Sequence, residues 1–381
     1  MPKFMMITPS SIWPSNSGGR LRSSLIAQAL RKHGPVRILS LSQETPLETP
    51  KGIEEVVIRP DCGSYIWRLL SQQTPLAPVV APMSIARINR HIEEFTPDVI
   101  FFEETITTGF IDQLRMGGAK TVLNSQNVDF QLLRERGVSD SKTLEAAKAQ
   151  EIAAINNTDM LISCSDRDAK IFENLTGKSA NVLENPIPDQ RAFDIPITPE
   201  RYRKSGFLFV GMMSYSPNAR AAEVIGNSIL PKLAPDVRAS LVGRHANTLP
   251  KNLQENARID IHSDVPSILD YLADFGQTLM PIASGGGTRL KVLEAMAAGV
   301  CLVASAKAVE GIDLIPNTHF ALAETPAEFA RAFQANIENP HESAQRAITA
   351  RQFVFDTYSE QIFEQRLKVC IDAILDQRAP A

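Results

Sequence analysis

The sequence predicts an α/β protein with two parallel-sheet domains. Three observations support this. Apolar strand-like runs alternate with helix-like segments, a proline-rich segment interrupts the alternation near the middle, and each half contains a strand, a glycine turn and a helix in succession. Such alternation is typical of parallel sheets, because each connection has to cross back along the sheet. Two sheets of this kind should place a ligand cleft at the carboxyl ends of their strands.

Composition narrows the class of protein. With 381 residues, 44% of them hydrophobic, the chain is long enough for two cores. A net charge of -4 and a pI near 5.9 provide no basic field, so we expect no nucleic-acid partner. Cys62, Cys164, Cys301 and Cys370 are scattered, which is typical of buried thiols in a reducing compartment. The first residues lack signal-peptide features and no apolar run approaches membrane-spanning length, so we expect a cytoplasmic protein.

In the first half, the first predicted strand leads into a glycine turn and a helix. The turn holds Gly18 and Gly19, and the helix is expected over residues 20–33. The glycine spacing differs from the G-x-G-x-x-G fingerprint and no acidic residue follows at the required distance, which argues against a nicotinamide cofactor. The predicted strands are residues 3–8, 36–41, 55–58, 98–102, 121–123, 160–163 and 181–183.

Two segments of the first half allow more than one interpretation. Residues 65–94 mix apolar side chains with arginines, which suits contact with a lipid surface or a lipid-linked substrate, or else a pair of helices packed on the sheet. Asp166 and Asp168 form an Asp-x-Asp pair after a strand and before a helix at 170–175. Capping by Ser165 and acidic residues in the first turn explain them better than a metal. We therefore assign no metal site.

The second half begins after residues 184–198, a segment that its prolines identify as an interdomain linker. Strands are predicted at residues 206–211, 239–243, 258–262, 277–281 and 300–305. Residues 344–375 are helical, with apolar side chains spaced to bury one face. No strand accompanies these last helices.

Residues 280–314 are the most informative stretch, because an apolar strand leads through three glycines into a helix at about 289–298. Free N–H groups and the helix dipole make such a turn a phosphate site, to which Arg289 and Lys291 add positive charge. Glu294 falls on the apolar stripe of this helix, where the ribose hydroxyls of a nucleotide would lie. A structural turn followed by a surface glutamate is the alternative.

These motifs resemble the GT-B glycosyltransferases, and among them the family-four retaining enzymes. The resemblance rests on Gly18-Gly19-Arg20, on FVGMMSYSPNARA, LVGR and DVPSILDYLADF, and on GGGTRLKVLEAMAAG followed by AVEG. It implies two Rossmann-like domains facing a central cleft, with a C-terminal helix that crosses back to the N-terminal domain. The expected domains are residues 1–187, completed by a helix at about 358–381, and residues 200–355, which would bind the nucleotide sugar.

The resemblance also implies roles for individual residues. Glu294 would bind the ribose hydroxyls, and Arg244 with Arg289 or Lys291 would bind the diphosphate. Gly286 stands where the family's E-x7-E motif has its first glutamate, so the usual contact with the transferred sugar is missing. The other positions expected to bind the donor are Gly18, Gly19, Gly211, Asn218, Gly287 and Thr288.

Catalysis by such an enzyme depends on charge at the diphosphate. Gln126 and Asn127 occupy the place of a histidine that is frequent in the family, and neither amide can act as a general base. Retaining transfer in this fold is attributed to the leaving diphosphate, which helps to deprotonate the acceptor, so positive charge around it is what the chemistry needs. The expected catalytic residues are therefore Arg289 and Lys291 with Gln126, Asn127 and Glu103, the last of which would orient an acceptor hydroxyl.

The expected function is transfer of a sugar, with retention, from a nucleotide-diphosphate donor to a glycan or glycolipid acceptor. The nucleotide sugar is a substrate, and no cofactor or metal is expected. The expected partners are the nucleotide sugar and a glycan or lipid-linked acceptor, with peripheral membrane contact through residues 65–94. Two alternatives stay open, because fold alone does not decide function. One is a nucleotide-sugar 2-epimerase, and the other is a binding protein that has lost catalysis through Gly286 and Gln126.

Overall fold

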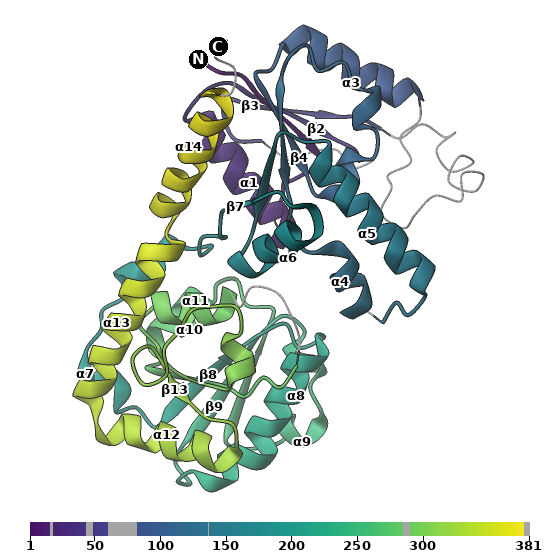
Figure 1. Cartoon of the computed structure of the whole chain (residues 1–381). Coiled ribbons are helices and arrows are strands. Elements are labelled where there is room, and N and C mark those ends of the chain that lie inside the picture. The colour runs from purple at the N-terminus through teal and green to yellow at the C-terminus, as the bar shows by residue number, and fades with distance from the viewer. Residues whose placement is uncertain (16–17, 43–48, 60–81, 136, 285–289, 377–381) are drawn as a thin grey trace. The chain divides into compact units, whose positions relative to one another are not determined.

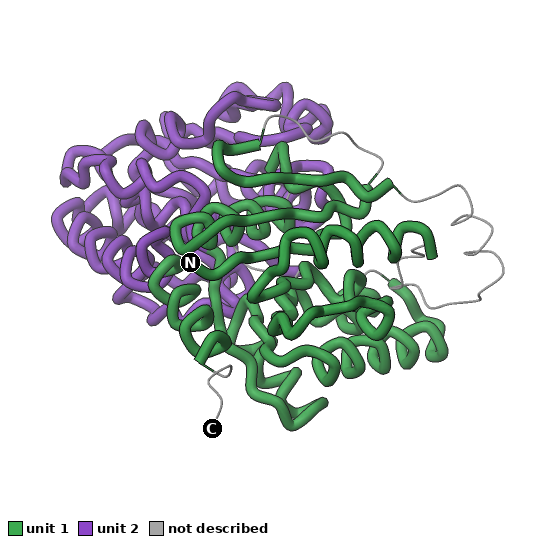
Figure 2. The backbone as a smooth tube through the Cα atoms, turned by 90° about the horizontal axis from the view of Figure 1, so that it is seen from above, with its two compact units in different colours: residues 1–185, 363–381 green, residues 186–362 purple. Residues whose placement is uncertain are grey.

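A computed structural model describes residues 1–15, 18–42, 49–59, 82–135, 137–284 and 290–376. The chain divides into two compact units, which Figure 2 shows in different colours. The first consists of Met1–Asn185 together with Phe363–Ala381, and the second of Pro186–Ile362. None of the helices in the described part of the chain is long and apolar enough to cross a membrane.

The first unit is built on a seven-stranded sheet of order β3-β2-β1-β4-β5-β6-β7, in which every neighbouring pair is parallel. The chain reverses its direction of progress across the sheet between β1 and β4 (Figure 1). Ligands of open parallel sheets bind at the carboxyl ends of the strands beside such a reversal. The strands are β1 (Phe4–Thr8), β2 (Val36–Ser40), β3 (Ile53–Val57), β4 (Val99–Glu103), β5 (Lys120–Asn124), β6 (Met160–Ser163) and β7 (Asn181–Val182).

Helices cover both faces of this sheet, because successive strand residues point to opposite sides. Phe4 and Met6 pack into a core with α1 and α14, whereas Met5 and Ile7 pack into a second core with α3, α5 and α6. The helices and 3₁₀ turns of the unit are α1 (Gly18–Arg31), α3 (Pro82–Phe95), η1 (Thr105–Thr108), η2 (Ile111–Gln113), α4 (Asp129–Glu135), α5 (Ser141–Asn156), α6 (Asp166–Thr176) and α14 (Glu360–Asp376).

The second unit repeats the plan with six parallel strands of order β10-β9-β8-β11-β12-β13. In this sheet the chain reverses its direction of progress between β8 and β11. A ligand is therefore expected beside the loops that follow these two strands. The strands are β8 (Gly206–Val210), β9 (Arg238–Gly243), β10 (Ile259–Ser263), β11 (Gln277–Met280), β12 (Cys301–Ala304) and β13 (Ala321–Leu322).

One buried apolar cluster forms the core of this unit. Helix α11, which carries Glu294, buries Val292, Leu293 and Met296 in it. The helical elements are η3 (Gln190–Asp194), α7 (Pro199–Tyr202), α8 (Ser216–Val224), η4 (Ile225–Ile229), η5 (Leu230–Lys232), η6 (Ala246–Thr248), α9 (Lys251–Gln254), α10 (Leu269–Asp274), α11 (Leu290–Ala297), η7 (Ala306–Val309), α12 (Pro326–Glu338) and α13 (Pro340–Tyr358).

The predicted fold class is confirmed: both halves are parallel α/β units, and α14 contributes Phe363, Leu367 and Ile371 to the core of the first. The boundary between the two units falls within the proline-rich segment, between Asn185 and Pro186. The part of the segment after the boundary packs on the second unit, where Ile187 and Ala192 are buried in the core. The C-terminal helices do not share one buried face, since Phe355 is exposed.

Several local predictions can be checked as well. Ser165 caps α6, as predicted, by accepting a hydrogen bond from the backbone N–H of Asp168. Cys164, Cys301 and Cys370 are buried free thiols, and Cys62 lies outside the described residues. The same holds for residues 60–81, which include most of the segment with two interpretations; its remainder forms α3, a helix packed on the sheet.

Candidate functional site

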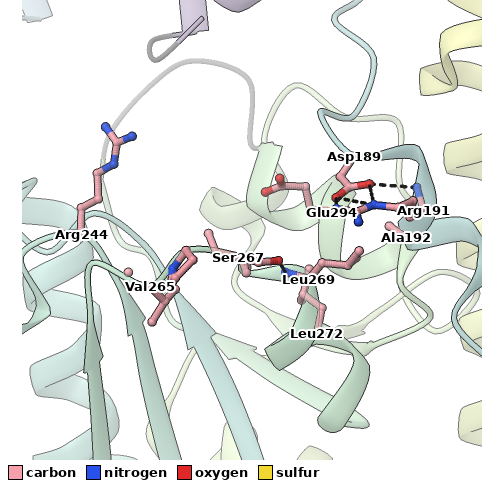
Figure 3. A pocket seen from close by; sticks show the side chains of 12 residues that line it. Asp189, Arg191, Ala192, Arg244, Val265, Ser267, Leu269, Leu272 and Glu294 are labelled. Atoms are coloured by element: carbon pink, nitrogen blue, oxygen red, sulfur yellow. Dashed lines mark hydrogen bonds and ion pairs between the residues drawn. The ribbon is translucent and has the colours of Figure 1, made fainter. Parts of the chain in front are cut away.

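A pocket of about 370 Å³ lies in the second unit at the carboxyl edge of its sheet (Figure 3). Its walls come from the loops after β9 and β10, from α11 and from the segment before β8. Apolar side chains of the β10 loop and α10 line one part, and charged side chains line the rest. The lining residues are Asp189, Arg191, Ala192, Gly243, Arg244, Val265, Pro266, Ser267, Ile268, Leu269, Leu272 and Glu294.

Glu294 and Arg244 are the two sequence-predicted donor-binding residues that the structure brings into this pocket. Glu294 lies on α11 between buried residues, and Arg244 lies in an exposed position directly after β9. Burial, with a further contribution from the charge of Asp189, raises the pKa of Glu294 to about 7. The pocket therefore combines a carboxyl group that titrates near neutral pH with a guanidinium group.

Two glycines make this edge compact. Gly243 ends β9 with a φ of 143°, and a Cβ added to it would lie 2.1 Å from the backbone oxygen of Gly211. The backbones after β8 and β9 can approach this closely only without a side chain. Hydrogen bonds from Gly211 N to Val242 O and from Met213 N to Arg244 O join the two loops.

Replacing Gly243 by alanine should therefore lower the free energy of unfolding by about 2 kcal/mol, since the new Cβ meets backbone and the φ angle is unfavourable. Chemical denaturation of the purified protein measures this. Gly206→Ala is the matched control, because an added Cβ there meets Phe275 at an ordinary 3.4 Å. Equal stability of the two variants would contradict the prediction.

Lys291 and Asn218 connect α11 with α8, the helix that follows β8. The Lys291 Nζ donates a hydrogen bond of 2.5 Å to Asn218 Oδ1 and lies 5.2 Å from the centre of the Phe209 ring. Asn218 in turn donates to the backbone oxygen of Met212 at 3.0 Å. A primary amine is thus held at the reversal point of the sheet. Gly286, Gly287, Thr288 and Arg289 lie outside the described residues.

Gly18, Gly19 and Gln126 lie in the first unit, at the carboxyl edge of its sheet. A Cβ added to Gly19 would lie 2.7 Å from Gln126 Oε1, so the glycine leaves room for this amide. The Gln126 Nε2 donates weakly to Gly19 O and Ser23 Oγ, both at 3.4 Å. Asn127, the next residue, is exposed.

The burial of Glu103 argues against the predicted contact with an acceptor. Its side chain is 0% exposed, and its Oε2 accepts hydrogen bonds from Ser23 Oγ at 2.6 Å and Asn124 Nδ2 at 2.8 Å. Burial raises the pKa of this carboxyl. Arg22, also buried, donates to Asn124 Oδ1, so the cluster Arg22–Asn124–Glu103–Ser23 is an internal network.

Glu104 follows Glu103 at the end of β4, and the sequence predicts the same role for both acids, the orientation of an acceptor hydroxyl. It adopts φ 69° and ψ 151°, an uncommon conformation for a residue other than glycine. Hydrogen bonds from its N–H to Asn124 O and from Thr107 to its own oxygen hold it there. Burial and the charges of Asp129 and Glu103 raise its pKa to about 7. Its side chain extends toward Gly19, where a Cβ would lie 3.4 Å from Glu104 Oε1.

Asp189 and Arg191 are pocket residues that the sequence analysis missed. They belong to the proline-rich segment, which composition alone identified as a linker. Among the described residues, no group of three or more histidine, cysteine or acidic side chains is arranged to hold a metal ion.

Comparison with known families finds a match for part of the second unit. Residues 204–339 match the family model described as "Glycosyl transferases group 1". The matched range lies within the second unit and includes Arg244, Lys291 and Glu294. The predicted resemblance to the group 1 glycosyltransferases is therefore confirmed over these residues. No curated protein matches the sequence of the chain.

Solved structures are similar over nearly the whole chain at low identity. HepE of Anabaena, in complex with UDP, has a TM-score of 0.70 at 14% identity, with 97% of this chain and 100% of that chain covered. Sucrose-phosphate synthase from Thermosynechococcus elongatus has a TM-score of 0.70 at 14% identity, with 99% and 100% covered. A glycosyltransferase from Rickettsia africae has a TM-score of 0.67 at 14% identity, with 98% of both chains covered. These similarities show the shared fold, the GT-B arrangement of two Rossmann-like units.

Proposed function

Since residues 204–339 of this chain match the group 1 glycosyltransferases, we propose that the protein transfers a sugar, with retention, from a nucleoside diphosphate sugar to a glycan or lipid-linked acceptor. The observation that carries this proposal is the pocket of the second unit, in which Glu294 and Arg244 line one cavity. HepE has been crystallised with UDP and with UDP-glucose, so uridine diphosphate sugars are the first donors to test.

In this proposal the chain's own side chains supply the chemistry. The Glu294 carboxylate binds the ribose by accepting a hydrogen bond from a hydroxyl, and Arg244 with Lys291 opposes the negative charge of the diphosphate. That charge grows as the bond between the sugar and the phosphate breaks, so fixed cations there lower the barrier. Positive side chains also make a metal ion unnecessary for this role. The acceptor would bind to the first unit, beside Gly19 and Glu104.

The test is to incubate the protein with a panel of sugar nucleotides and to measure release of nucleoside diphosphate, with and without acceptors extracted from cells. Release that depends on the acceptor, with a product of unchanged anomeric configuration by NMR, supports retaining transfer. Tight binding without turnover would indicate a binding protein, and interconversion of the donor sugar would indicate an epimerase. A product of inverted configuration would contradict retention.

A further inference from the structure

Asp189 is a second carboxylate in the nucleotide pocket. It lines the same cavity as Glu294, and its charge acts on that carboxyl group. Figure 3 shows the side chains of Asp189, Arg191 and Glu294 next to one another along the pocket. Asp189 precedes residues 204–339, so the family match assigns it no role.

Arg191 fixes this carboxylate in position. Asp189 Oδ1 accepts hydrogen bonds from the backbone N of Arg191 at 3.0 Å and from its Nε at 2.9 Å, and Oδ2 accepts from Nη2 at 2.6 Å. These hydrogen bonds lower the pKa of Asp189. Ala192, the next residue of η3, is buried in the core and anchors the turn. Asp189 is thus a preorganised, ionised acceptor.

Asp189 can accept a hydrogen bond from a ligand in place of a weak one. Three N–H groups of Arg191 make four contacts with the carboxylate, because Nε donates to Oδ1 at 2.9 Å and also to Oδ2 at the longer distance of 3.2 Å. A carboxylate offers about four lone-pair directions, so a ligand hydroxyl would replace the shared contact at Oδ2. Its side chain is 35% exposed, so a ligand can reach it. A ribose carries two neighbouring hydroxyl donors, which two adjacent carboxylates can accept separately.

We propose that Asp189 is a specificity-determining residue that accepts a hydrogen bond from one ribose hydroxyl of the bound nucleotide, while Glu294 accepts from the other. Arg191 is a positioning residue that holds Asp189 in place. The inference rests on the proposed function, since it requires a nucleotide in this pocket. It implies that the protein selects ribonucleotides over deoxyribonucleotides, because a missing hydroxyl leaves a carboxylate without its partner.

The test is a set of thermodynamic cycles measured by isothermal titration calorimetry. Wild type and Asp189→Asn are titrated with UDP, 2′-deoxy-UDP and 3′-deoxy-UDP, or with the same forms of GDP or ADP if these bind more tightly. Asparagine still caps η3, so the fold should be preserved. We expect Asp189→Asn to weaken binding of the ribonucleotide about tenfold. The affinity for one deoxy analogue, the one that lacks the hydroxyl bound by Asp189, should not change.

Two further variants sharpen the result. Asp194→Asn changes an exposed acid of the same 3₁₀ helix outside the pocket and should bind as the wild type does. Arg191→Ala should reduce the discrimination between the ribonucleotide and the deoxy analogue that lacks the hydroxyl bound by Asp189. Arg191→Lys should restore part of this discrimination. A role limited to stability would change the melting temperature without changing this discrimination.

The outcomes separate this inference from the proposed function. Asp189→Asn affinities that equal those of the wild type, or that fall equally for all three nucleotides, would overturn the role of Asp189. If Glu294→Ala still weakens binding in that case, the proposed donor site stands. If the wild type binds none of the diphosphates, the donor site itself is contradicted, and the role of Asp189 with it.

Discussion

Replacing Lys291 by methionine is expected to lower the rate of sugar transfer by about 10²–10³-fold, the usual cost of removing one preorganised group that stabilises developing charge. The Lys291 amine is held by Asn218 and lies over Phe209 at the reversal point of the second sheet. Methionine keeps the apolar stem, so the variant removes mainly the positive charge. Initial rates of nucleoside diphosphate release, with kcat and the donor KM determined separately, measure the effect.

Two controls test whether Lys291 acts through its charge. Asn218→Ala removes the hydrogen-bond partner and should slow transfer much less than Lys291→Met does. Lys232→Met removes an exposed lysine of η5 and should have no effect. If Asn218→Ala is as slow as Lys291→Met, the charge alone is not sufficient and its positioning by Asn218 sets the rate. A Lys291→Met enzyme of wild-type activity would mean that the diphosphate binds elsewhere.

The architecture could be predicted from the sequence, because the patterns that indicate a parallel sheet lie in short stretches of the chain. Each long strand is an apolar run bounded by turns or helices, and the alternation of strands and helices indicates that the strands are parallel. The order of the strands in each sheet comes from the structure alone. Strand β13, Ala321–Leu322, was not predicted. The prolines of segment 184–198 suggested a linker, and the boundary between the units does fall there. The burial of Ile187 was not predicted, because it depends on packing that composition does not encode.

The same distinction applies to the candidate sites. Glu294 was predictable because a charged residue interrupts an apolar stripe, and Arg244 because it stands in a motif shared with a family. Asp189 carries no such signal, since its position in the pocket depends on how its segment packs. Glu103 and Glu104 are adjacent acids at a strand end, and only the structure shows that the first joins an internal network while the second does not.

Replacing Glu294 by alanine is expected to weaken binding of the nucleoside diphosphate about 100-fold. A hydrogen bond between a hydroxyl and a charged carboxylate contributes about 1.5–3 kcal/mol, and the upper end of this range corresponds to this factor. Titration calorimetry with UDP measures it directly. Glu255→Ala, an exposed acid at the end of α9, is the matched control. An affinity equal to that of the control would remove Glu294 from the donor site.

Glu294 should also make binding depend on pH, because burial and Asp189 raise its pKa to about 7. The ionised carboxylate accepts hydrogen bonds from the ribose better than the protonated group does, so affinity is highest above pH 7 and falls as the pH is lowered through 7. The phosphate of the nucleotide titrates in the same range, but its effect on affinity is the same for the wild type and for Glu294→Ala and cancels when the two are compared. The dissociation constant of Glu294→Ala divided by that of the wild type should therefore be large at about pH 8.5 and should decrease as the pH is lowered to about 5.5.

Asp189→Asn removes the neighbouring negative charge, which should move the midpoint of this decrease to lower pH. A ratio that stays constant across this range would mean that ribose binding does not involve the titrating carboxyl of Glu294.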